Sequence, residues 1–165
     1  MTTRFCLLAA VSTLAFATPA WAAPGDPISL GEDLTVDLTV TARVRYEMVD
    51  QANLPDEAEA VTGRARVGAE FAAWGVKLLV EGEGTGALVN DYNDTLPFNG
   101  VEPFPVVADP ESIELNRLQL SYVANGNGVT FGRQRINLGN QRFVGAVGWR
   151  QNEQTFDALD VQHSL

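Results

Sequence analysis

The sequence predicts an all-β protein whose antiparallel up-and-down strands form part of a transmembrane β-barrel. Three observations support this fold class: segments with period-2 hydrophobicity recur, long and short connections alternate between them, and an export signal precedes them. The longest segment, 34–48, places Leu, Val, Ala, Tyr and Met on one side and Thr, Asp, Arg and Glu on the other. A strand that crosses a bilayer needs roughly 9–11 residues, more than the usual globular strand of about 5–6.

Residues 1–22 are predicted to be a secretory signal peptide. Arg4 supplies a positive charge, residues 5–17 are apolar, and Ala20 and Ala22 occupy the −3 and −1 positions of a cleavage site. The apolar run is shorter than the ~20 residues of a transmembrane helix. We therefore expect an exported chain, and its mature part has no cysteine because Cys6 lies in the signal peptide.

Residues 23–33 contain Pro, Gly and acidic residues without periodicity, and are interpreted as a periplasmic lead-in. The remainder, 34–165, is predicted to be the N-terminal part of the barrel. Six strands are expected in it, at residues 34–48, 62–73, 76–85, 113–122, 129–138 and 155–161. In the fourth strand the apolar positions shift phase between Leu115 and Leu118, which predicts a β-bulge.

The connections between these strands alternate in length. Tight turns are expected at Trp74-Gly75 and within 125–128, and long exposed loops at 49–61, 86–111 and 139–154. Outer-membrane barrels have short periplasmic turns and long extracellular loops, so this order places the lead-in on the periplasmic side. Because a water-filled barrel needs about 16–18 strands, we expect this chain to be a fragment of a larger one.

Composition excludes several classes of function. The chain has 11 basic and 21 acidic residues, a formal net charge of −10, which argues against nucleic-acid binding. The only histidine is His163, so a set of nucleophile, base and orienting residue cannot be assembled. We expect no enzyme activity, no cofactor and no metal. Every basic residue except Lys77 is arginine, whose rigid donor fork suits carboxylates.

A motif begins at Gly132 and comprises residues 132–138, 140–145 and 149–158. It resembles the alginate export family of outer-membrane porin-like proteins. The resemblance is carried by Gly132, Gln134, Asn140, Gln141, Phe143, Trp149, Gln151, Asn152, Glu153, Phe156 and Asp157. It implies a barrel of about 18 strands in the outer membrane that passively translocates an anionic polysaccharide or its oligomers. It also implies contact with the lipid bilayer and with periplasmic export machinery.

A pore for a chain of carboxylates needs an electropositive constriction, and arginine pairs with carboxylate through two parallel hydrogen bonds. The candidate pore-lining residues are Arg43, Arg45, Arg64, Arg66, Arg117, Arg133, Arg135, Arg142 and Arg150. Arg142 and Arg150 lie in the third long connection, which is hypothesised to fold inward. Arg133 and Arg135 share the phase of apolar Phe131, so either the strand kinks near Gly132 or these two lie at the rim.

Other interpretations remain open. The wall arginines could instead pair with Glu47, Glu70, Glu81 and Glu83 across strands and only hold the wall rigid. The pore could be a general porin of broader specificity. Amphipathic strands also occur in soluble β-sandwiches, so an exported β-rich carbohydrate-binding module is the alternative from another class.

Overall fold

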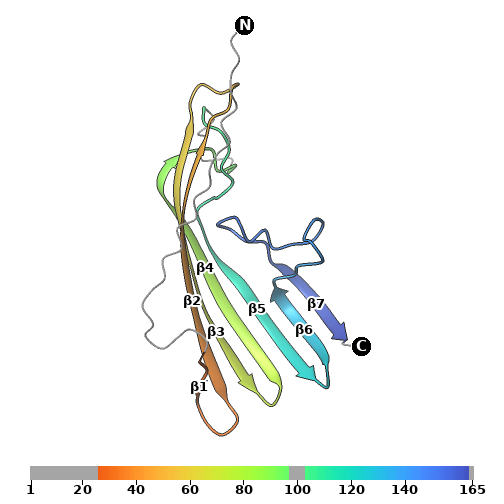
Figure 1. Ribbon diagram of the computed structural model, residues 1–165. Coiled ribbons are helices and arrows are strands. Elements are labelled where there is room, and N and C mark those ends of the chain that lie inside the picture. Colours follow the sequence, from red (N-terminus) through yellow and green to blue (C-terminus); the bar gives the residue numbers. More distant parts are fainter. Residues whose placement is uncertain (1–25, 97–102, 164–165) are drawn as a thin grey trace.

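The computed structural model describes residues 26–96 and 103–163, which form a single antiparallel sheet of seven strands (Figure 1). The strands are β1 (Ile28–Ser29), β2 (Thr35–Val49), β3 (Ala58–Ala73), β4 (Val76–Asp91), β5 (Ser112–Ala124), β6 (Asn127–Gln134) and β7 (Phe156–His163). They pair in sequence order, which confirms the predicted all-β up-and-down architecture. The sheet is open, with β1 and β7 at its edges. The predicted signal peptide lies outside the described residues.

Within the described part of the chain, no helix has the length and apolarity needed to span a membrane.

The strands differ from the expected ones mainly at their ends. The lead-in contains β1, a short strand that pairs Ile28 with Val36, so the prediction of six strands was one too few. β3 begins at Ala58 and β4 continues to Asp91, because their ladders run on through stretches whose acidic residues had suggested loops. β6 ends at Gln134, four residues earlier than expected.

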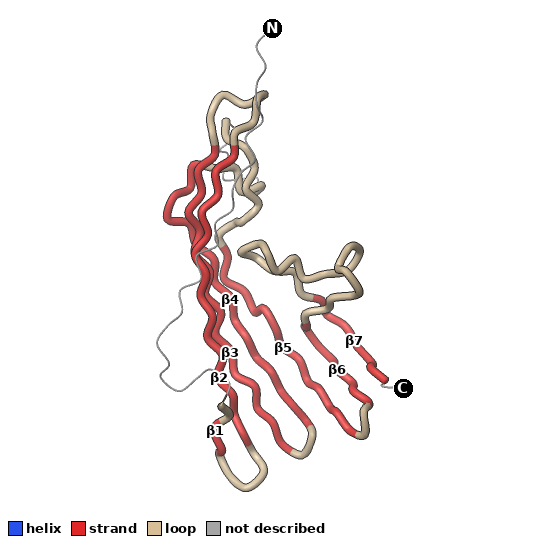
Figure 2. The backbone as a smooth tube through the Cα atoms, viewed as in Figure 1, coloured by secondary structure: helices blue, strands red, loops and turns tan. Residues whose placement is uncertain are grey.

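Two tight turns and three long connections lie at opposite ends of the sheet (Figure 2). The turns at Trp74-Gly75 and Asn125-Gly126 have positive φ at both residues, 51° and 80° in the first and 50° and 77° in the second. Two consecutive positive φ angles are typical of type I′ turns, whose twist suits a two-residue hairpin. We call this the turn end, and the end with connections 50–57, 92–111 and 135–155 the loop end.

One face of the sheet is apolar and the other polar, as the alternation predicts. Cross-strand pairing aligns the apolar side chains in rows, and one row consists of Val36, Phe71, Leu78, Leu120, Phe131 and Leu159. Nothing among the described residues covers most of this apolar face: Val40 is 61% exposed and Phe131 65%. The polar face contains the charged residues of β2 to β5 and contacts two of the long connections.

The predicted β-bulge is present in β5. Glu81 pairs with Arg117 and Gly82 pairs with Leu115, so Asn116 has no partner in the ladder. The extra residue shifts the apolar phase by one position, and the Asn116 side chain is buried. A second irregularity lies between Val61 and Thr62 in their pairing with β4, which the sequence had not indicated.

The described residues of the connection 92–111, which are 92–96 and 103–111, pack partly against the sheet at the loop end, in contrast to the exposed loop that was expected. Tyr92 and Val107 are buried against Ala58 and Ala60 of β3 in a small hydrophobic cluster. The Tyr92 hydroxyl donates to the Asp109 carbonyl oxygen at 3.1 Å, and burial together with nearby carboxylates raises the pKa of Tyr92 to about 12. Small alanines on β3 leave the space that this connection fills.

We expect Gly132→Ala to destabilise the fold. Gly132 has φ of +116°, and an added Cβ would overlap the carbonyl oxygen of Leu118 on β5. The strained backbone alone should lower the free energy of unfolding by roughly 1–3 kcal/mol. Urea denaturation measures this, with Gly82→Ala as the control because its Cβ would lie at an ordinary 3.7 Å from the nearest atom. Equal midpoints for the two variants would contradict the expectation.

Candidate functional site

The middle of the polar face is an array of buried ion pairs. Arg66 on β3 lies opposite Glu83 on β4, and their side chains are ion-paired. Arg117 on β5 lies opposite Glu81 on β4 and donates two hydrogen bonds to its carboxylate, from Nε at 2.9 Å and Nη2 at 2.6 Å. Both glutamates are buried. Arg66 and Arg117 are therefore paired with carboxylates of the neighbouring strand.

The connection 135–155 folds over this array and joins it through Glu153. The Glu153 carboxylate accepts hydrogen bonds from Arg135 at 2.9 and 2.5 Å and from the bulged Asn116 at 2.7 Å, and lies 3.1 Å from Arg66 Nη2. Burial tends to raise the pKa of Glu153, but the hydrogen bonds from Arg135 and Asn116 and the positive charges outweigh it, so the pKa is lowered. Glu153 is therefore held as a carboxylate.

Gln151 attaches the same connection to β2 and β3. Its side chain is fully buried. The amide oxygen accepts from Arg43 Nε at 2.9 Å, and the amide nitrogen donates to the carbonyl and hydroxyl oxygens of Thr62, both at 2.9 Å. The Gln151 backbone N–H donates to Asp109 at 3.1 Å. The side-chain amide and the backbone N–H of Gln151 thus bond to Arg43, Thr62 and Asp109, all on other segments. Gln151 therefore fixes the connection against the sheet.

Asp109, in connection 92–111, bonds both to connection 135–155 and to β2. Its carboxylate accepts from the Gln151 backbone and from Arg45 Nη1, the latter at 2.8 Å. Arg45 is also ion-paired with Glu47, two residues along β2. Asp109 is 1% exposed, so its charge is compensated by Arg45 within the protein. Arg45 is thus a paired residue like Arg66 and Arg117.

Arg43 and Arg64 differ from these arginines. The register of β2 and β3 places them directly opposite each other, and neither forms an ion pair with any residue in 26–96 or 103–163. Like charges in this arrangement repel. We call these two residues the arginine pair. The Arg64 Nε is buried and makes no hydrogen bond within the described structure.

Neutral oxygens of connection 135–155 surround the arginine pair. Arg43 donates to the Gly148 carbonyl at 3.0 Å, to the Arg150 carbonyl and to the Gln151 amide oxygen. Arg64 Nη1 approaches the same Arg150 carbonyl at 3.5 Å. One carbonyl oxygen is therefore shared by two guanidinium groups, without a carboxylate at this point.

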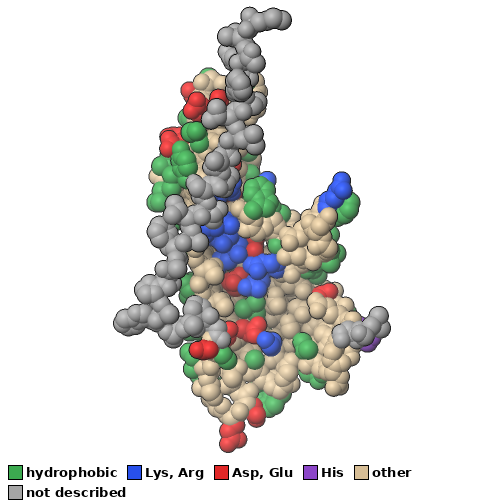
Figure 3. Space-filling view, viewed as in Figure 1, with side chains coloured by type: hydrophobic (Ala, Val, Ile, Leu, Met, Phe, Trp, Pro, Cys, Tyr) green, Lys and Arg blue, Asp and Glu red, His purple; other side chains and the backbone are tan. Residues whose placement is uncertain are grey.

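Trp149 extends the basic region toward the loop end. The guanidinium carbons of Arg45 and Arg150 lie 5.6 and 5.0 Å from its ring centroid, distances typical of cation–π contacts. Trp149 is 63% exposed, and together with Arg45 and Asp109 it lines a small cavity of about 140 Å³. The space-filling view shows basic side chains gathered midway along this face, with acidic ones beside them (Figure 3).

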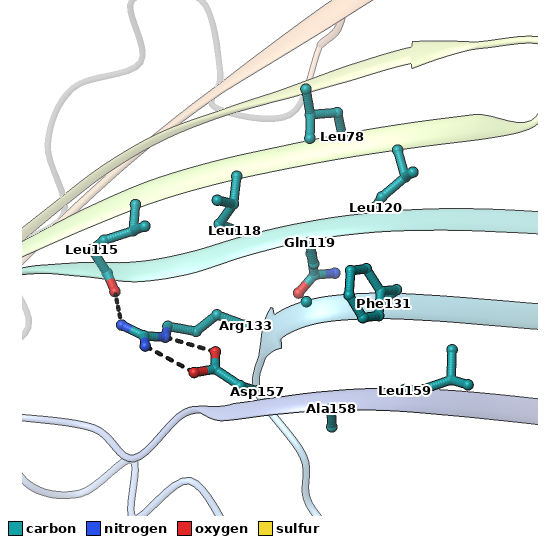
Figure 4. A pocket seen from close by; sticks show the side chains of 11 residues that line it. Leu78, Leu115, Leu118, Gln119, Leu120, Phe131, Arg133, Asp157, Ala158 and Leu159 are labelled. Atoms are coloured by element: carbon teal, nitrogen blue, oxygen red, sulfur yellow. Dashed lines mark hydrogen bonds and ion pairs between the residues drawn. The ribbon is translucent and has the colours of Figure 1, made fainter.

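Arg133 lies on the opposite face from the arginine pair. It pairs with Leu118 in the ladder and forms two hydrogen bonds with Asp157, at 2.9 and 3.0 Å, beside a groove lined by Leu78, Leu120 and other apolar residues (Figure 4). Arg135 faces Glu153 instead, because β6 ends at Gln134 and the alternation stops there. The shared phase expected for Arg133 and Arg135 is thus broken by the end of the strand.

Arg142 is exposed on connection 135–155, where its side chain lies over Phe143 with 5.8 Å to the ring centroid. Its backbone N–H bonds to Asn140, and Gln141 has a positive φ of 61°. Phe143 is 93% exposed. These motif residues form the outer bend of the connection, and the structure does not bring Arg142 to the other arginines through any hydrogen bond or ion pair between described residues.

The remaining motif residues fasten the connection at its base. Gln134 is buried and its amide donates to the Ala158 carbonyl of β7 at 3.0 Å. Asn152 donates to Ser112 Oγ at 2.7 Å, and Phe156 pairs with Gln134 in the ladder. The motif therefore specifies how residues 135–155 dock on the sheet.

Three residues important for this site were not predicted: Thr62, Asp109 and Asn116. The phase shift located the bulge, but it did not indicate that the Asn116 amide would bridge Glu81 and Glu153. No sequence pattern indicated a role for Thr62 or Asp109, because Gln151, to which both bond, lies far away in the sequence. In the described residues, no group of three or more His, Cys, Asp or Glu side chains could hold a metal ion.

Comparisons with protein-family models, curated proteins and solved structures find no match. Function is therefore inferred from the geometry of the two faces of the sheet.

We expect Glu153→Gln to destabilise the protein by about 3–5 kcal/mol, because it removes a buried carboxylate that balances Arg135 and Arg66. The lowered pKa of Glu153 means that its stabilising effect is present above the ordinary value of 4.5 and is lost as the pH falls through the folded-state pKa. Urea unfolding at pH 7 and in acid measures both effects.

The matched control for this prediction is Glu57→Gln, at an exposed carboxylate without an ion pair among the described residues. The Glu153→Gln protein should lose less stability on acidification than the control does. A parallel decline of both variants would mean that Glu153 makes no special contribution.

Proposed function

We propose that this sheet is part of the wall of an outer-membrane pore through which an anionic polysaccharide, or its oligomers, passes passively. The observation that carries the proposal is the arginine pair. Arg43 and Arg64 face each other on the polar side without a carboxylate partner in the described structure, while Arg45, Arg66 and Arg117, on the same strands or on β5, are paired with acids. An anion from outside the protein is the missing partner.

The two faces of the sheet support a position between lipid and water. Large apolar side chains on the apolar face are one-third to two-thirds exposed on strand after strand, for example Val80 at 37% and Leu159 at 65%. A bilayer is a suitable solvent for these apolar side chains. The charges of Arg133 and Asp157 on the same face compensate each other in an ion pair with two hydrogen bonds. The polar face, with its ion pairs and docked connections, then borders the aqueous passage.

The chemistry of the arginine pair suits a carboxylate. Guanidinium remains charged at all physiological pH values and binds a carboxylate with two parallel hydrogen bonds. Two such groups on adjacent strands produce a local positive potential that attracts a polyanion, and the ion pairs of Arg45, Arg66 and Arg117 hold the surrounding wall in place. Conduction requires that each of these contacts exchange readily, so that a polymer advances without stalling.

An aqueous pore of this type needs about 16–18 strands. The described sheet has seven, and β1 covers only the first two residues of β2 along its outer edge. The proposal therefore requires further strands to pair with β2 and β7. The resemblance of residues 132–158 to the alginate export family suggests a uronate polymer as the solute.

Fractionation tests the location. We expect the protein to remain with outer membranes after washing with salt and carbonate, and to be extracted only by detergent, because its apolar face contacts lipid. A soluble periplasmic binding protein of the same cells serves as the control, and it should be recovered without detergent. Recovery in the periplasmic fraction without detergent would contradict the membrane proposal and favour the soluble carbohydrate-binding module.

Ion selectivity tests the arginine pair. In planar bilayers, the protein purified from outer membranes should conduct anions in preference to cations, and Arg64→Glu should weaken or reverse this preference because it places a carboxylate opposite Arg43. The measurement is the reversal potential in a salt gradient.

Arg142→Glu provides the comparison with the same change of charge at the exposed bend. If Arg142 also borders the passage, both variants lose anion preference; if it does not, only Arg64→Glu does. Unchanged selectivity in Arg64→Glu would show that the arginine pair is structural, and equal conductance of anions and cations in the unaltered protein would indicate a porin of broader specificity.

A further inference from the structure

We infer that residues 147–151 form a latch that occupies the arginine pair with neutral oxygens and that an anionic solute must displace. The latch comprises the carbonyl oxygens of Gly148 and Arg150 and the side chain of Gln151. This inference rests on the proposed function and concerns the regulation of the same site. The positioning residue is Gln151, which acts through Arg43.

The contacts of the latch resemble those of a bound carboxylate. The Gly148, Arg150 and Gln151 oxygens accept from Nη1, Nη2 and Nε of Arg43, so they lie around the edge of the guanidinium group where carboxylate oxygens would lie. The Arg150 oxygen is also 3.5 Å from Arg64. The latch therefore satisfies donors of the arginine pair without compensating its charge.

A solute carboxylate can compete with these neutral acceptors. Hydrogen bonds to an ionised acceptor are roughly twice as strong as those to a neutral one, and the carboxylate also relieves the repulsion between Arg43 and Arg64. The displaced carbonyls can be hydrated on a water-facing surface. An uncharged sugar offers no such advantage, so the latch discriminates between anionic and neutral solutes as well as limiting access.

The backbone of the latch is strained where it begins. Val147 has φ of +51°, in the left-handed region that β-branched residues rarely adopt. The bend is closed by hydrogen bonds from Arg150 N to the Val147 carbonyl at 3.0 Å and from Gln154 N to the Ala146 carbonyl at 2.8 Å. Release of the latch would allow Val147 to relax, which lowers the cost of displacement.

Gln151 sets the balance between the closed and released latch. Its amide bonds to Arg43 and Thr62 hold the segment down. When the binding-competent form is only a fraction of the population, the apparent Kd rises in inverse proportion to that fraction. Weakening the latch should therefore tighten solute binding, whereas a Gln151 that only supported Arg43 would weaken binding when removed. The two roles of Gln151 therefore predict opposite changes in the apparent Kd when it is replaced.

The test is titration calorimetry of the detergent-purified outer-membrane protein with a uronate tetrasaccharide, and with maltotetraose as the uncharged control. Gln151→Ala should lower the apparent Kd for the uronate about fivefold. Gln151→Glu should raise it about tenfold or more, because a tethered carboxylate pairs with Arg43 permanently. Gln154→Ala, at an exposed residue of connection 135–155 outside the latch, should leave the Kd unchanged.

Thr62→Val provides a second variant in case Gln151→Ala fails to fold. It removes only the hydroxyl acceptor of the Gln151 amide, and should lower the Kd by a smaller factor in the same direction. In the Trp74→Phe variant, with Trp21 removed as part of the predicted signal peptide, Trp149 fluorescence should change when uronate is added because the latch is released. Unchanged fluorescence with bound uronate would contradict release of the latch.

The outcomes separate the latch from the proposed function. A higher or unchanged Kd in Gln151→Ala and Thr62→Val, with uronate still bound by the unaltered protein, would overturn the latch and leave the anion site intact. Failure of the unaltered protein to bind uronate would overturn the proposed function and the latch with it.

Discussion

The register between β2 and β3 forces Arg43 and Arg64 to face each other, and the arrangement of the polar face follows from this constraint. A slip of one residue in either strand would move its arginine to the apolar face, away from the acceptors of connection 135–155. In the observed register the two arginines repel, so the structure around them must supply acceptors. Connection 135–155 supplies them from its backbone and from Gln151, and Thr62 and Asp109 hold that connection in place.

On the polar face, ion-paired residues lie on both sides of the arginine pair. Toward the turn end, Glu81, Glu83 and Glu153 balance Arg66, Arg117 and Arg135. Buried ion pairs of this kind contribute little net stability, but removal of one partner is costly, so they hold a single arrangement. Between these ion pairs and those of Arg45 toward the loop end, the arginine pair has only neutral partners. Asn116 ties the ion pairs nearer the turn end together by contacting both Glu81 and Glu153.

The features predicted correctly from sequence are those that neighbouring residues determine. Alternation defined the two faces, residues 125–128 indicated a tight turn, and the phase shift between Leu115 and Leu118 located the bulge. The division of the arginines into paired and unpaired could not be predicted, because it depends on contacts between distant segments: Arg43 and Gln151 are 108 residues apart. For the same reason the acidic composition of 86–111 suggested an exposed loop, although Val107 and Asp109 are buried by β3 and its neighbours. The third long connection, predicted at 139–154, was hypothesised to fold inward, but its sequence did not indicate which of its oxygens would contact Arg43.

The strict sequence order of the seven strands has a consequence for how the sheet is made. Each ladder joins a strand to its predecessor in the chain, so loop-closure entropy is small at the two-residue turns and each hairpin can form soon after its second strand is available. The arginine pair belongs to the early β2–β3 ladder, whereas Gln151 comes from a segment between β6 and β7. The ladder that sets Arg43 opposite Arg64 can thus form without residues 148–151, so relief of the repulsion between the two arginines depends on a part of the chain made much later.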